Sequence, residues 1–372
     1  WLKPPEVAPA ACANMSPRTL AGRSPCSSIS GSLSPVFARS SSPFSAPSPV
    51  QGADVCTGDA WDSSEPATGS GSRPERADAS EPGEPRMWQL QDFEVGSRIG
   101  TGTFGEILLA RERQDRTVVV LKAMRKRRIE RFHVQRHVAH EINIQCHLRH
   151  PGVLRLLGYF WDDVKIYMIL EPAPHGDLAR ALRKQPGGVF DEAKAAACVL
   201  EVAESVAYCH SKHVMHRDLK PHNVLVGHGG RLKLADFGWA AHSLPGDRRW
   251  TLCGTLDYLP PEMVYVTQGH GFEVDVWSLG VLAYELLVGE PPFVDACRTA
   301  TYKKILAASP DFPDAAAIGQ RPAHSSAAQA FVRRLLRREP AERPVASSLA
   351  DEPWLSGDGH RALPQRWRAG GC

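Results

Sequence analysis

The residues most able to do chemistry in this 372-residue sequence lie in two short runs near its middle. The first is HRDLKPHN at 216–223, in which an aspartate in a tight loop, Asp218, can accept the proton of a hydroxyl group. Asn223 in the same run offers an amide oxygen to a divalent metal ion. The second run is DFG at 236–238, whose Asp236 can bind a metal that bridges phosphate groups. Together these residue types indicate metal-assisted transfer of a phosphoryl group.

A glycine-rich run, GTGTFG at 100–105, precedes these residues. The GxGxxG pattern alone also occurs in dinucleotide-binding folds, where it leads into a helix. Here it is followed by EILLAR at 106–111, which continues as a strand. A glycine loop between two strands lets backbone N–H groups lie over phosphates without side chains in the way. The loop alone supports a nucleotide lid and a plain hairpin turn equally.

Lys122 ends the apolar, β-branched run VVVLK, so its strand is expected to be buried on at least one face. A single lysine on a strand is usually a solvated surface residue. Glu141, however, lies in the helix predicted to follow, at a position from which it can pair with the lysine. Such an ion pair between a strand and a helix holds a lysine against nucleotide phosphates.

The elements that must position these residues can be read from periodicity and residue type. Strands are predicted at 93–99, 107–110, 117–122 and 164–170, with the last pairing with a strand at 153–157. Helices are predicted at 130–148, 193–211, 274–287 and 327–336. A small β-rich half therefore precedes a larger helical half.

Composition separates this folded part from the residues before it. Residues 1–86 are rich in Ser, Pro, Ala and Gly and hold close to half of the 30 prolines, so they are predicted to be a disordered extension. Its Ser-Pro steps fit a proline-directed kinase. The formal net charge of +3 is too small to indicate direct binding to nucleic acid or to a membrane surface. No apolar run approaches the ~18 residues of a membrane-spanning helix.

Three later features complete the pattern: PPE at 260–262, DVWSLG at 275–280 and Arg343. In this order and spacing the motifs resemble the eukaryotic protein kinases, from about residue 93 to 354. The resemblance implies an α+β fold with two lobes, in a kinase domain at 93–355. The small β-rich N-lobe would span about 93–171 and the larger helical C-lobe about 174–355. Residues 356–372 would form a short basic tail.

Four stretches narrow the resemblance: HLRHP at 147–151, GYF at 158–160, DFGW at 236–239 and TLCGTLDYLPPE at 251–262. Together they resemble the Aurora family of mitotic serine/threonine kinases. This resemblance implies ATP-dependent phosphorylation of Ser or Thr near basic residues, in chromosome segregation, spindle function or cytokinesis. The expected locations are the nucleus and cytoplasm, with chromosomes or centromere, spindle or centrosome during division.

The resemblance also implies a role for each matching residue. Asp218 would be the catalytic base, Lys220 would steady the transferring phosphoryl group, and Lys122 would contact the α- and β-phosphates. Asn223 and Asp236 would hold Mg²⁺. The residues expected to bind ATP, through side chains or backbone, are Ile99, Gly100, Gly102, Gly105, Lys122, Glu141, Leu170, Glu171, Ala173, Asn223 and Asp236.

Regulation and substrate choice follow from further matches. Thr251 matches the activating phosphorylation site, where added negative charge would attract Arg217 and order the surrounding loop. The preceding basic residues give Thr251 the form of an Aurora substrate, so autophosphorylation in trans is expected. Asp177 and Glu285 occupy positions where related kinases hold a substrate arginine.

Three residues depart from the family pattern. His222 stands in the catalytic loop where glutamate is usual, which removes an acid from the substrate cleft. His140 replaces an arginine that helps to hold the phosphorylated loop, and a histidine is only partly charged at neutral pH. Val120 replaces the usual alanine two residues before Lys122, which adds bulk over the adenine.

Two alternatives remain beside an active Aurora-type kinase: a non-catalytic pseudokinase or scaffold, and a basophilic kinase of a neighbouring group. The resemblance further implies an activating partner docked on the N-lobe, of the spindle-assembly-factor or the inner centromere protein type. Gly158 resembles the spindle-type member, whereas Leu363-Pro364 resembles the passenger type. The sequence therefore leaves the partner open.

Overall fold

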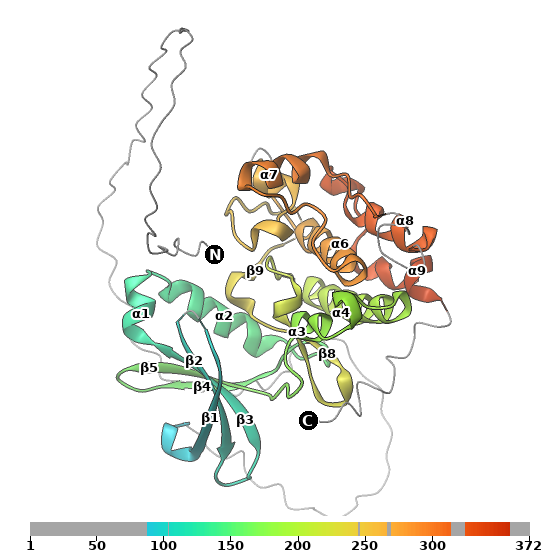
Figure 1. Ribbon diagram of the computed structural model, residues 1–372. Helices are drawn as coiled ribbons and strands as arrows, with labels where there is room; N and C mark the ends of the chain where they lie inside the picture. Colours follow the sequence, from blue (N-terminus) through green and yellow to red (C-terminus); the bar gives the residue numbers. More distant parts are fainter. Residues whose placement is uncertain (1–87, 103, 245, 266–268, 314–323, 358–372) are drawn as a thin grey trace, which may run out of the picture. The chain divides into compact units, whose positions relative to one another are not determined.

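The computed structural model describes residues 88–102, 104–244, 246–265, 269–313 and 324–357 (Figure 1). The predicted disordered extension at 1–86, with its Ser-Pro steps, lies outside the described residues, and so do residues 358–372 of the predicted basic tail. The fold that the described residues adopt is the predicted one: a five-stranded sheet is followed by a largely helical part.

The sheet is antiparallel throughout and has the strand order β1-β2-β3-β5-β4. Its strands are β1 Phe93–Thr101, β2 Gly105–Glu112, β3 Val118–Arg125, β4 Leu156–Trp161 and β5 Lys165–Leu170. The central strand β3 is apolar on both faces because both are covered. Leu121 packs on one face with the aromatic cluster around Phe160, and Met124 packs on the other. Lys122 shares the second face, which carries the helices.

Two helices cover that face, α1 Lys126–Arg131 and α2 Gln135–His147 (Figure 1). The prediction of one helix over 130–148 is therefore wrong. The chain breaks at His133, whose φ of 55° lies in the left-handed region that continues no α-helix. The break lets α2 run in its own direction past the sheet, with Val138 and Ile142 packed on β3 and β5.

The predicted strand at 153–157 is also misplaced. Strand β4 begins at Leu156 and pairs with β5 through a tight turn. The carboxylate of Asp162 stabilises this turn by accepting hydrogen bonds from the N–H groups of Val164 and Lys165 at 2.7 and 2.6 Å. Val153 instead forms a single parallel bridge with Leu234 in the helical part. The hydrogen bonds of Asp162 thus place the turn, and with it strand β4, further along the chain than the apolar pattern predicted.

The helices of the second part are α3 Leu178–Arg183, α4 Glu192–Ser211, α5 Pro261–Val264, α6 Glu273–Val288, α7 Arg298–Ala307, α8 Ser326–Leu335 and α9 Pro353–Ser356. Those predicted at 193–211, 274–287 and 327–336 are confirmed. Side-chain oxygens cap α3, α4 and α8 at Asp177, Asp191 and Ser325. Helix α6 is buried almost throughout, and at Gly280 an added Cβ would lie 2.8 Å from Cβ of Leu335, so glycine permits the contact with α8.

Two small antiparallel sheets, unforeseen from sequence, lie within this helical part. Their strands are β6 Val214–Met215, β7 Val224–Val226, β8 Leu232–Leu234 and β9 Ala241–His242, paired β6 with β9 and β7 with β8. The run at 216–223 leaves β6 and enters β7, and the run at 236–238 leaves β8 and leads to β9. The two chemically important loops are therefore fixed at both ends by strand pairing.

Short 3-10 helices occur at Leu90–Asp92, Pro186–Gly188, Pro221–Asn223, His228–Gly230, Phe237–Trp239, Leu256–Tyr258, Pro340–Glu342 and Ala346–Asp351. Those at Pro221–Asn223 and Phe237–Trp239 lie in the two loops just described. Among the described residues, every helix is too short or too polar to cross a membrane.

Candidate active site

The glycine-rich loop joins β1 to β2, as predicted. Ile99 and Gly100 lie near the end of β1, Gly102 lies in the turn, and Gly105 begins β2. A side chain at Gly105 is impossible because its Cβ would lie 1.7 Å from the carbonyl oxygen of Ala123. At Gly102 nothing lies within 4 Å of an added Cβ. The fold therefore requires glycine at 105, while the space above Gly102 is open to a ligand.

Lys122 lies at the centre of a carboxylate pair. Its Nζ is 2.7 Å from Oε1 of Glu141 on α2 and 3.5 Å from Oδ1 of Asp236. Burial alone would lower the pKa of Lys122, but the charges of Glu141 and Asp236 outweigh it and raise the pKa. The charge of Lys122 in turn lowers the pKa of Asp236. The predicted pair of Lys122 and Glu141 is thus present in the structure. Lys122 also lies close to Asp236, another predicted site residue.

Asp218 is almost completely buried and is held by three neighbours. Nζ of Lys220 donates to its Oδ2 at 2.7 Å, and the hydroxyl of Thr255 donates to its Oδ1 at 2.7 Å. Lys220 also donates to the Thr255 hydroxyl at 2.7 Å. The amide of Asn223 donates to the carbonyl and to Oδ2 of Asp218 at 2.8 and 2.9 Å. The carboxylate is therefore fixed in orientation by groups from two loops.

Thr255 was not predicted as a site residue. It lies in the 251–262 stretch that carried the family resemblance, but nothing in its type or spacing shows that its hydroxyl would reach Asp218 across 37 positions. Only the folded chain brings these two residues together.

Asp275 fixes the backbone of the loop that carries Asp218. Its carboxylate, at the start of α6, accepts hydrogen bonds from the N–H groups of His216 and Arg217 at 2.9 and 2.8 Å, and it lies 2.8 Å from Nε2 of His210. Burial would raise the pKa of Asp275, but these hydrogen bonds and the nearby imidazoles hold it below its usual range. An ionised aspartate is thus used to shape the backbone on either side of Asp218.

Asp236 occupies a strained position beside Asn223. Its φ is 64°, which non-glycine residues seldom adopt, and the next residue, Phe237, is buried in the core against the ring of His216. The N–H of Ala235 donates to the carbonyl of Asn223 at 2.8 Å, so the two loops run side by side. The Asp236 side chain remains 55% exposed. An open carboxylate near an amide oxygen is a donor set that suits Mg²⁺.

The end of β5 and the segment after it form the hinge between the two parts. Leu170 is buried and lies opposite Val120 in the sheet. The side chain of Glu171 is bound by Nζ of Lys233 at 2.9 Å and by the N–H of Arg155 at 2.7 Å. The N–H of Glu171 donates to the carbonyl of Arg155. This hydrogen bond turns that N–H away from a ligand, so only other backbone groups of the predicted adenine-binding segment can serve.

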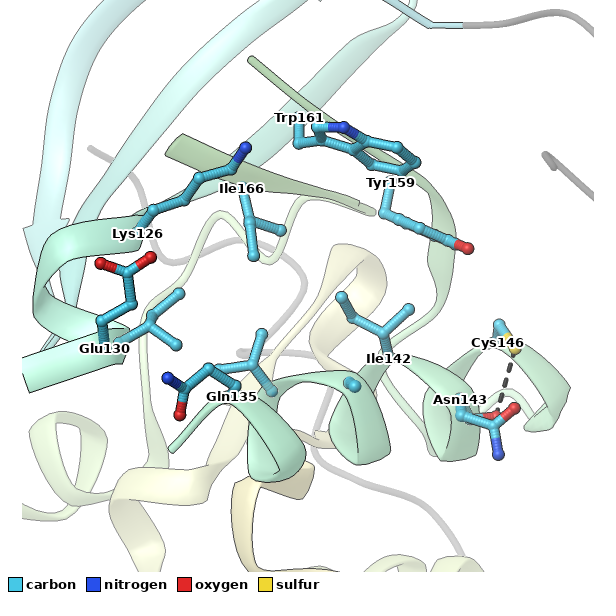
Figure 2. A pocket seen from close by; sticks show the side chains of 12 residues that line it. Lys126, Glu130, Gln135, Ile142, Asn143, Cys146, Tyr159, Trp161 and Ile166 are labelled. Atoms are coloured by element: carbon cyan, nitrogen blue, oxygen red, sulfur yellow. Dashed lines mark hydrogen bonds between the residues drawn. The ribbon is translucent and has the colours of Figure 1, made fainter. Parts of the chain in front are cut away.

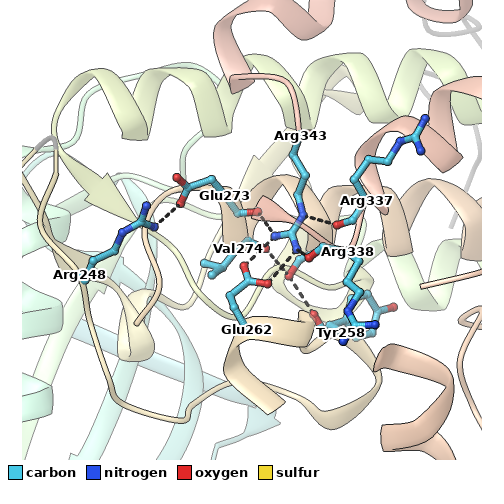
Figure 3. A network of polar contacts seen from close by, with 9 residues as sticks. Arg248, Tyr258, Glu262, Glu273, Val274, Arg337, Arg338 and Arg343 are labelled. Carbon is cyan, nitrogen blue, oxygen red and sulfur yellow. Dashed lines mark hydrogen bonds and ion pairs between the residues drawn. The ribbon is translucent and has the colours of Figure 1, made fainter. Parts of the chain in front are cut away.

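Thr251 is exposed, and the residues just before it are docked on the start of α6. Arg249 and His270 exchange two backbone hydrogen bonds of 2.9 and 2.8 Å. The guanidinium of Arg248 lies 3.4 Å from the carboxylate of Glu273 (Figure 3). Figure 3 also shows the carbonyl of Glu273 accepting a hydrogen bond from the buried Arg343 at 3.0 Å.

Arg343 forms the most buried ion pair among the described residues. It contacts both carboxylate oxygens of Glu262, at 2.7 and 2.8 Å, and donates to the carbonyls of Arg337 and Arg338 (Figure 3). The PPE run and the late arginine, noted in the sequence only for their order, are thus one structural unit. That unit supports the segment that carries Thr251.

His140 lies on α2 and faces strand β9 of the small β6–β9 sheet. Its ring is edge-on to His242 at a centroid distance of 6.0 Å. Burial lowers the pKa of His140, and the nearby His242, Arg217 and Arg249 lower it further. The folded structure therefore disfavours the charged form of His140, the residue expected from the sequence to stand in place of an arginine.

The two predicted substrate carboxylates lie in different settings. One carboxylate oxygen of Asp177 caps the N-terminus of α3, because it accepts a hydrogen bond from the N–H of Arg180 at 2.7 Å. Glu285 on α6 is half-buried, and its Oε2, which is buried, has no hydrogen-bond partner among the described residues. Burial, aided by the charge of Asp257, raises the pKa of Glu285 to about 7, and the charge of Arg183 opposes this.

His222 and Arg183 modify this acidic region. Burial lowers the pKa of His222, with the charge of Asp177 acting in the opposite sense and that of Arg183 in the same sense. Arg183 therefore influences both His222 and Glu285, a cation that the sequence did not single out. It reduces the negative potential available to a basic substrate.

A separate cavity of about 480 Å³ lies in the sheet part, between α1, α2, β4 and β5 (Figure 2). Its walls are mainly apolar, with Ile129, Ile142, Tyr159, Trp161 and Ile166 among the residues that line it. Lys126 and Glu130 stand at one end (Figure 2). The cavity touches the same helix, α2, that carries Glu141.

Comparisons with known proteins agree with this geometry. Residues 93–355 match the family described as the protein kinase domain. The chain is 44% identical over 275 residues to Aurora kinase A-B of Xenopus laevis, a match that covers 74% of this chain and 64% of the relative. It is 43% identical over 281 residues to serine/threonine-protein kinase Aurora-1 of Arabidopsis thaliana, covering 76% and 92%. Aurora kinase B of Danio rerio is 42% identical over 281 residues, covering 75% and 83%.

The fold and the matched region define a protein kinase. Within that class, the chain belongs to the Aurora family of serine/threonine kinases. It spans less than two thirds of the length of the frog relatives it matches.

Proposed function

We propose that this chain is an active Aurora-type kinase that transfers the γ-phosphoryl group of ATP to Ser or Thr in proteins. The observation that carries the proposal is the continuous arrangement of Glu141, Lys122 and Asp236, next to the loop that holds Asp218 and Asn223. A non-catalytic scaffold would not need a strained backbone at Asp236, nor a buried Asp218 that three neighbouring side chains hold by hydrogen bonds.

In this proposal the chain's own residues do mainly positioning work. Glu141 holds Lys122 so that its ammonium can contact the α- and β-phosphates. Lys220 and Thr255 hold the Asp218 carboxylate, which takes the proton of the substrate hydroxyl. Phosphoryl transfer asks for little covalent chemistry from the protein, so a fixed geometry supplies much of the rate.

Asn223 and Asp236 would hold Mg²⁺. The amide N–H groups of Asn223 are turned toward Asp218, which leaves its oxygen for a metal, and the Asp236 carboxylate is open. When bound, the ion neutralises phosphate charge. The adenine would lie between the glycine-rich loop, with Ile99, Gly100, Gly102 and Gly105, and the hinge. There the carbonyl of Glu171 and the N–H of Ala173 would pair with it beside Leu170.

The substrate would be a protein with basic residues near the target Ser or Thr. Asp177 and Glu285 are the groups proposed to receive a substrate arginine, although Asp177 is partly occupied as a helix cap. The neighbouring Arg183 and the histidine at 222 would make this selection weaker than two free carboxylates would.

Activation would need phosphorylation of Thr251 and a partner on the N-lobe. The cavity beside α2 suits a partner segment with apolar or aromatic side chains, of the inner centromere protein or the spindle-assembly-factor type (Figure 2). A partner there would press on the helix that carries Glu141. The physiological setting proposed is division, at chromosomes, centromere, spindle or centrosome.

A kinase assay on a basic peptide tests the proposal, with each activator fragment added in turn. Transfer of labelled phosphate that one fragment stimulates is expected. The Asp236→Asn variant should fold as the wild type does and transfer nothing. An Asp236→Asn protein of full activity would overturn the catalytic assignment.

A further inference from the structure

A ring contact joins the glycine-rich loop to the end of α1. Phe104 in the loop packs against Phe132, with ring centroids 6.1 Å apart and ring planes at 67°. This edge-to-face arrangement is one that aromatic pairs prefer. Phe132 is nevertheless 54% exposed. Burial in a core therefore does not account for an aromatic residue at this position, and the contact with the loop does.

The end of α1 is built so that Phe132 has a fixed direction. The N–H of Val134 donates to the carbonyl of Ile129 at 3.1 Å, and the N–H of His133 donates to the carbonyl of Glu130 at 3.0 Å. These two bonds form a Schellman motif, and Val134 packs against the apolar cluster that contains Ile129. The motif needs a left-handed residue at 133, a position where glycine is usual and this chain has histidine. Phe132 thus precedes a turn whose backbone is fully specified.

Phe104 is attached on its other side as well. Its carbonyl accepts a hydrogen bond from the N–H of Arg125 at 3.0 Å, at the point where β3 leads into α1. Its ring packs against the cluster that contains Val138 and Ile142 of α2. The loop over the nucleotide site is therefore connected both to the ends of α1 and to α2, the helix that carries Glu141.

We propose that Phe132 is a positioning residue for nucleotide binding. Its ring holds Phe104, and through it the glycine-rich loop, in the position that covers the nucleotide phosphates. This inference rests on the proposed function, since it takes ATP to bind beneath that loop. A loop that is ordered before binding loses less conformational entropy when the nucleotide arrives, so the contact raises affinity for ATP. The proposed role of Phe132 concerns the nucleotide only, so peptide affinity should stay unchanged.

The test uses the full chain with Phe132→Ala, Phe104→Ala and the double variant. Calorimetry measures the Kd for Mg-ATP, and steady-state kinetics give KM for ATP, KM for a basic peptide and kcat. Phe132→Ala should weaken ATP binding roughly three- to tenfold, the range expected for one aromatic pair. The peptide KM should not change. The double variant should bind ATP no more weakly than Phe104→Ala, because both changes remove the same contact.

Two controls separate this role from a general loss of structure. Phe132→Tyr keeps the ring and should restore wild-type ATP affinity. Val164→Ala removes another exposed apolar side chain of the same sheet part and should leave ATP affinity unchanged. Thermal unfolding verifies that each variant is folded, and Phe132→Leu replaces Phe132→Ala if the latter is not.

An ATP affinity within about twofold of wild type for Phe132→Ala would overturn the inference, as would effects of the two alanine changes that simply add. A wild-type protein that binds Mg-ATP but transfers no phosphate would instead refute the proposed function. The binding measurements would still decide the role of Phe132 in that case.

Discussion

The hydroxyl of Thr255 lies 2.7 Å from Oδ1 of Asp218 while Nζ of Lys220 holds the other carboxylate oxygen at the same distance. The carboxylate is therefore fixed from both sides. Thr255 comes from the segment that follows Thr251, so this hydrogen bond reports whether that segment is in place.

Replacing Thr255 by valine keeps the shape of the side chain and removes the hydrogen bond. We expect kcat on a basic peptide to fall about tenfold or more, because a carboxylate held through one oxygen only spends less time in line with the substrate. Thr255→Ser keeps the hydroxyl and should retain most of the activity. Equal kcat values for the valine and serine variants would show that the hydrogen bond has no part in catalysis.

The half-buried Glu285 predicts a pH dependence of substrate choice. Because burial raises the pKa of Glu285 to about 7, its charged form increases as pH rises from about 6 to 8. Only the charged form attracts a substrate arginine, so KM for an arginine-containing peptide should fall over this interval. A peptide with alanine in place of that arginine should show no such fall.

Glu285→Gln supplies the matched variant for this test. It should abolish the difference in pH dependence between the two peptides while leaving kcat near the wild-type value. If the arginine peptide kept its pH dependence in Glu285→Gln, another group would be responsible for it.

The neutral His140 predicts a weak response to phosphorylation of Thr251. Burial and the adjacent cations lower the pKa of His140, so it carries little charge at neutral pH. His140→Arg should increase the ratio of activity between the Thr251-phosphorylated and the dephosphorylated protein, by about two- to tenfold for one added charge-assisted hydrogen bond. The Thr251→Ala background is the control, in which His140→Arg should change nothing.

His140 also predicts how the stability of the protein changes with pH. Because folding lowers the pKa of His140, the unfolded chain binds a proton there more readily than the folded chain does, so the folded state is destabilised as pH falls below 6.5. The wild type should therefore lose more of its free energy of unfolding between about pH 7 and pH 5.5 than His140→Gln does. Denaturant unfolding at the two pH values measures the difference.

The buried pair of Arg343 and Glu262 should matter for folding more than for chemistry. The Arg343 side chain is fully buried and its removal leaves a carboxylate in the interior. Arg343→Ala should lower the free energy of unfolding by about 3–5 kcal/mol. Arg343→Lys should recover only part of this loss, because an ammonium cannot contact both carboxylate oxygens and three carbonyls together. A loss below about 1 kcal/mol for Arg343→Ala would contradict the structural role.

The sequence predicts the parts of this molecule in which residue type and local geometry coincide. The glycine loop, the Lys122–Glu141 pair and the long helices follow from turn chemistry, strand burial and apolar periodicity. It fails at His133, since a histidine gives no local sign of a left-handed turn. It fails also at β4, where the Asp162 turn decides the hairpin.

The site shows the same division. Asp218, Asn223 and Asp236 lie in loops whose motifs are specific, so their assembly was foreseeable. Thr255 and Arg183 reach the site from segments far away in the chain, and the buried setting of Glu285 depends on the packing of α6. Contacts of this kind exist only after tertiary folding, so no local pattern encodes them.

The backbone pairing of Arg249 with His270 and the contact of Arg248 with Glu273 hold the basic residues before Thr251 against the protein's own surface. If a second copy of the kinase phosphorylates Thr251, as proposed, that copy would bind both arginines fully only after this segment has detached. Self-activation would then depend on the opening of this segment as well as on encounter. The onset of activity should show a lag that shortens with protein concentration and reaches a plateau set by the opening rate.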